Sequence, residues 1–486
     1  MLTLNDPSLF REQCYVNGQW IDADDKSVIK VDNPSKGEII GSVPKFGAAE
    51  TRRAIDAAEA AWAGWRALTP KERGACLIKW HDLIQENKQD LARILSYEQG
   101  KPVAESLGEI ALGSSYIPWY AEECRRTYGD VIPAPRKGIR PITHHQPVGV
   151  VFAITPWNFP MSMIARKTAP ALAAGCPVLV KPASATPYSA LAMAELAHRA
   201  GFPAGVFNVL TGSASVMAAE MASNVKVRKV TFTGSTEVGK KLTAQTAQTM
   251  KRVSMELGGN APFVVFDDAD LALTLNCAYG SKVRNAGQTC ISTNRILVQE
   301  GIAQSFVTGL VERFKTLKVG DGFEDNVEVG PLINQSAVEH CEALLADAVS
   351  KGAKILLGGK RHALGGNFFE PTVLTGMTRE MRIFHEEIFG PIAPIMTFAS
   401  EAEAVELAND TPFGLASYVF TQNLSRAWRI PEALEYGLCG VNDAALALAE
   451  APFGGVKESG TGREGGREGL LDFMETRYVL MGGIGA

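Results

Sequence analysis

The stretch Val148-Gly-Val-Val-Phe-Ala-Ile-Thr-Pro-Trp-Asn-Phe-Pro160 joins an apolar run of strand length to a turn that contains two prolines and an asparagine. Three further apolar runs follow it, and Ala-rich helical stretches separate them. Continuous apolar strands that alternate with helices predict a parallel sheet with both faces covered. The four runs are Val148–Ile154, Val178–Val180, Val206–Leu210 and Val230–Phe232.

Each of these runs ends in a short turn that contains polar residues or glycine. Ligands of open α/β sheets bind at the carboxyl ends of the strands. We therefore expect the four turns to line one crevice. They are Thr155–Pro160, Lys181–Ser184, Thr211–Ser213 and Thr233–Thr236.

A second α/β alternation runs from about Ala261 to Asn442 and predicts a separate domain of similar design. The N-terminal part begins with a hairpin signal at Asn17-Gly18 and continues with helical spacing from about Ala48 to Gly100. The tail, Phe473–Leu480, is strand-like, and we expect it to pair with Ile139–Val151. The apolar runs of the second alternation are Phe263–Phe266, Ile296–Val298 and Ile355–Leu357.

Composition limits the class of protein. A chain of 486 residues is too long for a single core and predicts two or three domains. The formal charge of −5 has no long run of one sign, which argues against a nucleic-acid partner. The N-terminus lacks a basic segment followed by an apolar one, and no stretch has the roughly 20 apolar residues of a membrane span. We therefore expect a cytoplasmic protein with no membrane partner.

Cysteine and histidine usage points away from disulfides and metals. The eight cysteines include no CxxC pair, which fits a reducing compartment. The seven histidines form no HExxH motif and no cluster with cysteine, so we expect no metal site.

One cysteine, Cys290, lies in the polar, Gly-bearing segment Arg284-Asn-Ala-Gly-Gln-Thr-Cys-Ile-Ser292. A thiolate is a strong nucleophile, and it forms where the surroundings lower the pKa of the thiol or supply a base. An isolated cysteine is more often a small buried apolar residue, and the other seven lie in apolar or helical contexts. Cys290 is thus the candidate nucleophile, and this role requires an ionised and reachable sulfur.

Seven motifs in order resemble those of the aldehyde dehydrogenase superfamily and span most of the chain. Two of them resemble the glutamate and cysteine signatures of that superfamily. The motifs are Pro156-Trp-Asn-Phe-Pro160, Lys181-Pro-Ala-Ser184, Phe232-Thr-Gly-Ser-Thr-Glu-Val-Gly239, Ser254-Met-Glu-Leu-Gly-Gly-Asn-Ala-Pro262, Gly287-Gln-Thr-Cys290, Glu386-Glu-Ile-Phe-Gly-Pro391 and Pro452-Phe-Gly-Gly-Val-Lys-Glu-Ser-Gly460.

The resemblance implies an α/β fold with two Rossmann-like domains and a small β oligomerisation arm exchanged between subunits. It implies a homodimer or homotetramer, because strand pairing across subunits removes an exposed edge. The expected parts are a cofactor-binding domain (1–126 and 147–258), a catalytic domain (259–440), a return segment that packs on the cofactor domain (441–469) and the arm (127–146 and 470–486).

The resemblance also implies a covalent mechanism. Cys290 would attack the aldehyde carbon to give a thiohemiacetal, whose oxyanion the side-chain amide of Asn158 and the backbone N–H of Cys290 would hold. Loss of hydride to a nicotinamide would leave a thioester, and Glu256 would activate the water that hydrolyses it.

The implied cofactor is NAD or NADP. Lys181 would bind the adenosine ribose, Gly234 and Ser235 the pyrophosphate, and Glu387 the nicotinamide ribose. The motif lacks GxGxxG spacing, so the site is Rossmann-like rather than the standard fingerprint. Ser184 is short and neutral, so we expect a 2′-phosphate to be tolerated. The further cofactor contacts that we expect are Thr155, Pro156, Trp157, Leu257 and Phe389.

Within the superfamily the chain looks most like the succinate-semialdehyde dehydrogenases, in which two arginines clamp the distal carboxylate of the substrate. These match Arg166 and Arg284, and two guanidiniums suit a carboxylate because each offers a planar fork of donors. Relatives commonly have a serine in the loop before Pro-Phe-Gly-Gly, whereas this chain reads Ala444-Ala-Leu-Ala-Leu-Ala-Glu450. A different anionic head, such as a sulfonate or an α-keto acid, or a less polar chain therefore stays open.

Three other functions remain as alternatives at this point. The enzyme could oxidise a neutral aliphatic or aromatic aldehyde, or it could pass the thioester to coenzyme A, although Glu256 favours water. A nucleotide-binding or structural protein on the same fold would need none of Cys290, Glu256 and Asn158.

Overall fold

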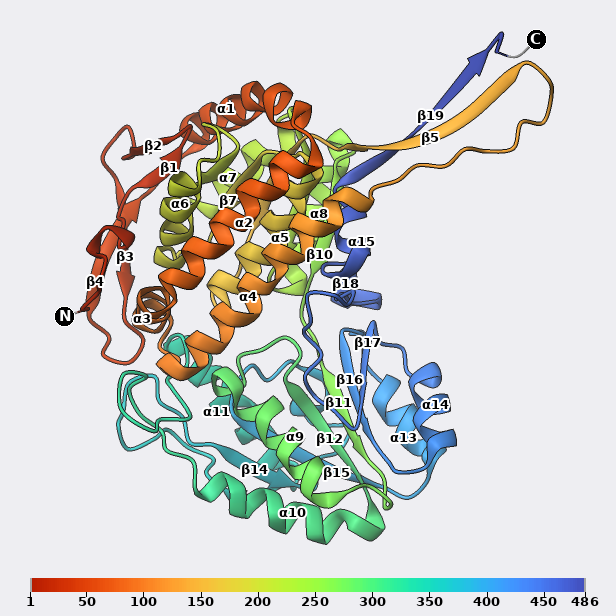
Figure 1. Cartoon of the computed structure of the whole chain (residues 1–486). Coiled ribbons are helices and arrows are strands. Elements are labelled where there is room, and N and C mark those ends of the chain that lie inside the picture. The colour runs from red at the N-terminus through yellow and green to blue at the C-terminus, as the bar shows by residue number, and fades with distance from the viewer. Residues whose placement is uncertain (1, 485–486) are drawn as a thin grey trace.

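The computed structural model describes residues 2–484, so Met1, Gly485 and Ala486, which belong to the expected cofactor domain and arm, lie outside the described residues. Two α/β lobes lie one above the other, and a two-stranded ribbon projects away from the upper lobe (Figure 1). Each lobe contains a largely parallel sheet. The predicted fold class, two α/β units with a β arm, is confirmed.

The sheet of the first lobe contains all four predicted apolar runs as adjacent parallel strands next to β10, the strand that ends at Glu256. The predicted Asn17-Gly18 hairpin forms its antiparallel edge, and both turn residues have positive φ. In spatial order the strands are β18 (Gly460–Thr461), β10 (Arg252–Glu256), β9 (Val227–Thr233), β6 (Val150–Ile154), β7 (Val178–Lys181), β8 (Phe207–Val209), β1 (Cys14–Val16) and β2 (Gln19–Ile21).

Helices cover this sheet as the sequence spacing predicts. Leu77, Trp80 and Ile84 of the second helix are completely buried. The Thr69 hydroxyl accepts the N–H of Glu72, which caps the helix that begins at Pro70. The helices of this lobe are α1 (Ala48–Ala67), α2 (Pro70–Glu86), α3 (Lys88–Gln99), α4 (Val103–Glu123), α5 (Pro160–Ala174), α6 (Tyr188–Ala200), α7 (Ala214–Ser223), α8 (Thr236–Thr246) and α15 (Gly466–Leu471); β3 (Val28–Asp32) and β4 (Ile39–Pro44) form a separate hairpin.

The sheet of the second lobe is parallel except at one edge. The run Ile355–Leu357 forms that edge strand, which pairs antiparallel, and Ile355 and Leu356 are exposed rather than buried. In spatial order the strands are β13 (Lys354–Leu357), β14 (Thr372–Thr375), β15 (Ile392–Phe398), β12 (Thr293–Gln299), β11 (Ala261–Val265), β16 (Ala416–Phe420) and β17 (Leu438–Val441). The helices are α9 (Leu271–Val283), α10 (Glu300–Lys315), α11 (Gln335–Ser350), α12 (Arg382–His385), α13 (Glu401–Asn409) and α14 (Leu424–Ala433).

The projecting arm is an antiparallel pair of β5 (Ile139–Pro147) and β19 (Met474–Gly482) (Figure 1). The predicted pairing of the tail with residues near 139 is confirmed, but it ends at Pro147. After Gly149, with φ +123°, the chain enters the first sheet as β6. Within the described residues, every helix is too short or too polar to span a lipid bilayer.

Two glycines differ in backbone conformation and in the space around them, so replacing each by alanine should change stability in opposite directions. Gly18 has a φ of +77°, and an added Cβ would lie 3.2 Å from the Cβ of Ala204, whereas Gly64 lies within α1 with open space around it. We expect Gly18→Ala to lower the free energy of unfolding by about 1–2 kcal/mol. Gly64→Ala should raise it by about 0.5–1 kcal/mol. Urea unfolding measures the free energy of unfolding of each variant. Equal changes in the two variants would contradict the strained backbone conformation at Gly18.

Candidate active site

A cavity of about 260 Å³ lies where the two lobes meet, and it contains most of the predicted site residues. The turns after β6 and β9 line one side, and the nucleophile loop and the segment before β15 line the other. The predicted residues that line it are Pro156, Trp157, Asn158, Gly234, Ser235, Leu257, Cys290, Glu387 and Phe389, and they are joined by Thr233 and Gly258.

The predicted adenosine contacts do not line this cavity; they lie at the end of β7, the neighbour of β6 in the sheet. The N–H of Thr155 donates to the carbonyl of Lys181 at 3.2 Å, which joins the turns after β6 and β7. Burial lowers the pKa of Lys181 to about 8, and Ser184 is half-buried in the same turn. The predicted turn Thr211–Ser213 does not line the cavity, because Gly212 pairs with Phe46 of the N-terminal segment.

Two consecutive glycines allow the strand of Glu256, the nucleophile loop and Glu387 to meet. A Cβ on Gly259 would collide with the carbonyl oxygen of Cys290, and a Cβ on Gly258 would lie 2.9 Å from a carboxylate oxygen of Glu387. The N–H of Gly259 donates to Glu387 at 3.0 Å. Side chains at either position would therefore separate the groups that form the site.

The loop before Cys290 has an unusual backbone. Asn285 and Ala286 have φ values of +51° and +54°, a region that costs a residue with a Cβ about 1–2 kcal/mol. Buried hydrogen bonds hold this conformation: the Asn285 N–H donates to Glu105 at 3.0 Å, and Gln99 donates to the Asn285 side-chain oxygen at 2.9 Å. The first lobe thus supports the nucleophile loop directly.

A buried ion pair fixes the position of Asn158. Lys101 Nζ donates to the Asn158 carbonyl and to Glu109, each at 2.7 Å, and Glu109 also accepts the N–H groups of Met161 and Ser162 at the start of α5. The Asn158 side-chain nitrogen donates to the carbonyl of Gln288 at 3.0 Å. An amide nitrogen carries two N–H donors, so one remains for a ligand in the cavity.

Burial disfavours the charged forms of both Glu256 and Cys290. Burial, and then the charge of Glu464, raise the pKa of Glu256 well above its ordinary value, although Arg166 and Lys167 oppose this. Burial raises the pKa of the Cys290 thiol to about 12, despite the charge of Arg166. Desolvation thus opposes ionisation of the Cys290 sulfur more strongly than the charge of Arg166 favours it. Cys290 is partly exposed and shares the cavity with Asn158.

The two predicted substrate arginines lie in different surroundings. Arg166, on α5, is buried and forms an ion pair with Glu464 at 2.6 Å, and Lys167 binds the same carboxylate at 2.5 Å. Arg284 lines a second cavity of about 260 Å³ that is also bordered by Thr289 and Ile291, the two neighbours of Cys290. Arg166 does not line this second cavity.

Unsatisfied polar atoms in the crevice fit a polar ligand such as a dinucleotide. Within residues 2–484, the hydroxyls of Thr155 and Thr233, the side-chain oxygen of Asn158 and both carboxylate oxygens of Glu256 are buried without a hydrogen-bond partner. Burying such atoms unpaired is costly, so their concentration here indicates that a ligand satisfies some of them. Burial raises the pKa of Glu387 to about 7, although the N–H of Gly259 and the charge of Lys282 favour its ionised form.

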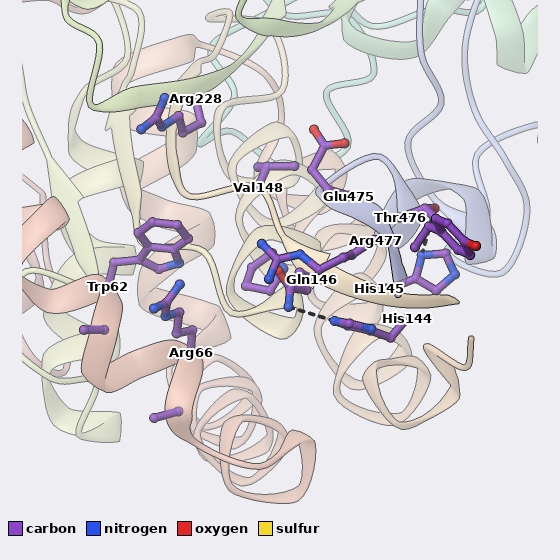
Figure 2. Close-up of a pocket in the computed structure, with 14 residues that line it drawn as sticks. Trp62, Arg66, His144, His145, Gln146, Val148, Arg228, Glu475, Thr476 and Arg477 are labelled. Atoms are coloured by element: carbon purple, nitrogen blue, oxygen red, sulfur yellow. Dashed lines mark hydrogen bonds between the residues drawn. The ribbon is translucent and has the colours of Figure 1, made fainter. Parts of the chain in front are cut away.

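A hollow of about 1210 Å³ lies elsewhere, between α1 and the arm (Figure 2). Trp62 and Arg66 of α1 face Gln146 and Arg477 of the arm there, and none of the predicted site residues lines it. Across the part of the chain that the structure describes, histidine, cysteine and acidic side chains nowhere gather in a group of three that could hold a metal ion.

Sequence reasoning missed the residues that support the site from a distance. Lys101, Glu109 and Glu464 are charged residues that contact segments far away in the chain, and nothing in their local sequence predicts burial. Charged residues are seldom buried, so burial of these three would have marked them as important, but burial is known only once the fold is known.

Comparisons with known proteins agree with this geometry. The model of the family described as "Aldehyde dehydrogenase family" matches residues 20–479. The chain is 55% identical over 483 residues to a glutarate-semialdehyde dehydrogenase of Pseudomonas aeruginosa, a match that covers 99% of this chain and 100% of the relative. It is 53% identical over 481 residues to an NADP(+) succinate-semialdehyde dehydrogenase of Escherichia coli (99% and 100%). The crystal structure of a succinate-semialdehyde dehydrogenase from Burkholderia pseudomallei superposes with a TM-score of 0.98 at 54% identity, covering 99% of this chain and 100% of that one.

The Lys101–Glu109 pair should affect reactivity at Cys290 through the position of Asn158. Removing one charge would leave the other buried and unpaired, so we choose the neutral double variant Lys101→Met/Glu109→Gln. We expect a fall in aldehyde-oxidising kcat of about 100-fold, because the amide donor loses its support, with KM changing about threefold or less. Lys79→Met on the exposed face of α2 is the control. A folded double variant with unchanged kcat would contradict this role.

Proposed function

The chain belongs to the aldehyde dehydrogenase family, and we propose that it oxidises a small aldehyde with a distal anionic group, such as succinate or glutarate semialdehyde, to the acid with NAD or NADP. The observation that supports this most strongly is the position of Cys290 between two cavities. One contains Asn158 and the proposed cofactor residues, and the other contains Arg284.

The proposed chemistry begins with loss of the proton from the Cys290 thiol. Glu256, once ionised, is the nearby base, and it interacts electrostatically with the sulfur. The sulfur then bonds to the aldehyde carbon, and the free N–H of Asn158 and the N–H of Cys290 hold the oxyanion. After oxidation, Glu256 takes a proton from the water that attacks the thioester, and the carbon–sulfur bond breaks.

The proposed dinucleotide site follows the turns of the first sheet. When bound, the dinucleotide supplies the hydride acceptor. Lys181 and Ser184, at and after the end of β7, would contact the adenosine ribose, and the helix start after Gly234 and Ser235 suits a pyrophosphate. Glu387 would bind the nicotinamide ribose. The remaining proposed contacts are Pro156, Trp157, Leu257 and Phe389, which line the cavity, and Thr155, which precedes them.

The distal anion is proposed to bind Arg284. Its guanidinium lies 5.0 Å from the ring of Phe159 and lines the cavity. Arg166 would have to leave Glu464 to bind a substrate carboxylate, so in the resting state we assign it a supporting role, as a cation that favours the ionised form of Cys290.

We further propose the domain limits expected from the sequence. The first sheet takes its strands from 14–21, 150–256 and 460–461, which supports a cofactor domain (1–126 and 147–258) with a return segment (441–469). The second sheet takes its strands from 261–441, which supports the catalytic domain (259–440). The arm (127–146 and 470–486) exposes the apolar side chains of Tyr478, Leu480 and Met481, which supports its proposed role in a homodimer or homotetramer.

The role of Arg284 is tested by comparing two aldehydes. Arg284→Gln should lower kcat/KM for succinate semialdehyde by about 10- to 100-fold, because a charged hydrogen-bonded contact is lost, and leave hexanal within about threefold. Arg125→Gln on the surface serves as the control. Equal losses for both aldehydes would show that Arg284 does not recognise the anion.

The raised pKa values of Glu256 and Cys290 predict a pH dependence. Both groups act only after losing a proton, so kcat/KM should rise with pH between about 6 and about 9. Glu256→Gln should weaken this rise and reduce steady-state turnover by about 100-fold or more, while a first turnover of NAD(P)H persists. Glu237→Gln, an exposed change on α8, should alter neither property. An unchanged profile in Glu256→Gln would exclude this carboxylate as the base.

Ser184 is proposed to tolerate the 2′-phosphate of NADP. Ser184→Glu should lower the ratio of kcat/KM for NADP to that for NAD by about tenfold or more, because two negative charges would be adjacent. Ser184→Gln has the same length without the charge and should keep the ratio within about threefold. A ratio that does not respond to the carboxylate would place the 2′-phosphate elsewhere.

A further inference from the structure

The cavity beside Cys290 carries two opposite charges that do not pair with each other. Arg284 and Asp443 both line it, yet among residues 2–484 neither forms an ion pair within 4.0 Å. The Arg284 guanidinium lies over the ring of Phe159, and Asp443 accepts a single hydrogen bond through Oδ1, from the N–H of Ala445 at 2.9 Å. The second carboxylate oxygen of Asp443 therefore remains available to a ligand.

A third group in the cavity also lacks a partner. The hydroxyl of Thr289 is buried and has no hydrogen-bond partner within the described chain, and Thr289 lines the same space. Ala444 and Ala445, which follow Asp443 on the loop after β17, contribute no hydroxyl or amide side chain. The polar groups offered to the far end of a substrate thus include one cation, one anion and the unpaired hydroxyl of Thr289, since the hydroxyls of Ser281 and Tyr418 bond to Thr293 and to the Ile291 carbonyl.

This combination of charges does not suit a substrate whose distal end carries a single negative charge and no positive charge. A carboxylate attracted to Arg284 would be repelled by Asp443 in the same cavity of about 260 Å³. A head group with an ammonium on the carbon next to its carboxylate would satisfy both charges, because each partner would face its opposite.

We propose that the cavity recognises an aldehyde whose distal end is a 2-amino acid, with the carboxylate on Arg284 and the ammonium on Asp443. This refines the substrate class and rests on the proposed function. The oxidation itself is unchanged: the amino acid head stays intact, and only the aldehyde carbon reacts at Cys290.

A matched pair of substrates tests the proposal. Succinate semialdehyde and L-aspartate 4-semialdehyde have the same four-carbon chain and differ only in the 2-amino group. In the unmodified enzyme, kcat/KM should be higher for the amino compound. Asp443→Asn keeps the shape of the side chain and removes its charge, and it should lower the ratio of the two values by about fivefold, as expected for one partly exposed ion pair.

Glu450→Gln on the same loop is the charge-matched control, because Glu450 does not line the cavity, and it should leave the ratio unchanged. A ratio below one in the unmodified enzyme, or a ratio that Asp443→Asn does not move, overturns the proposal. The proposed function survives that result if succinate semialdehyde is oxidised and depends on Arg284. If the enzyme oxidised neither compound, both this proposal and the proposed function would be rejected.

Discussion

The close approach of three backbone segments at Gly258 and Gly259 is the constraint on which the site depends. These glycines follow β10 and let the nucleophile loop and Glu387 contact the same short stretch. Neither position has room for a side chain, so the nucleophile loop and Glu387 reach the stretch that follows Glu256 only because no Cβ intervenes. The two sheets hold the segments in place, since Glu256 ends a strand of the first lobe and Cys290 precedes a strand of the second.

The fold buries the reactive groups of the site, and their removal from water changes their pKa values. Burial raises the pKa values of both Glu256 and Cys290, so it opposes the charged form that each group needs for the reaction. Formation of these charges therefore depends on compensating interactions in the site, such as the charge of Arg166, which favours the ionised form of Cys290. Charges that support the site, such as Lys101 with Glu109 and Arg166 with Glu464, are instead paired and remain fixed.

The fold could be predicted largely from local patterns. The apolar runs from Val148 to Phe232 are strands in the first sheet, and Asn17-Gly18 forms a hairpin, because these features depend on neighbouring residues. Ile355–Leu357 is equally apolar but forms an exposed edge, which local pattern cannot distinguish. The grouping of Asn158, Cys290 and Glu387 was foreseen from family motifs. The protonation states and the buried supports were not, because they arise from contacts between distant segments.

The most direct measurement is the covalent state of the Glu256→Gln variant after it has been mixed with succinate semialdehyde and NADP. If Cys290 forms the bond to the substrate and Glu256 completes its hydrolysis, intact-protein mass spectrometry should show a persistent acyl adduct, and peptide mapping should place it on Cys290. Absence of an adduct in a variant that still reduces NADP, or an adduct on another cysteine or on a lysine, would contradict the assignment of this thiol as the nucleophile.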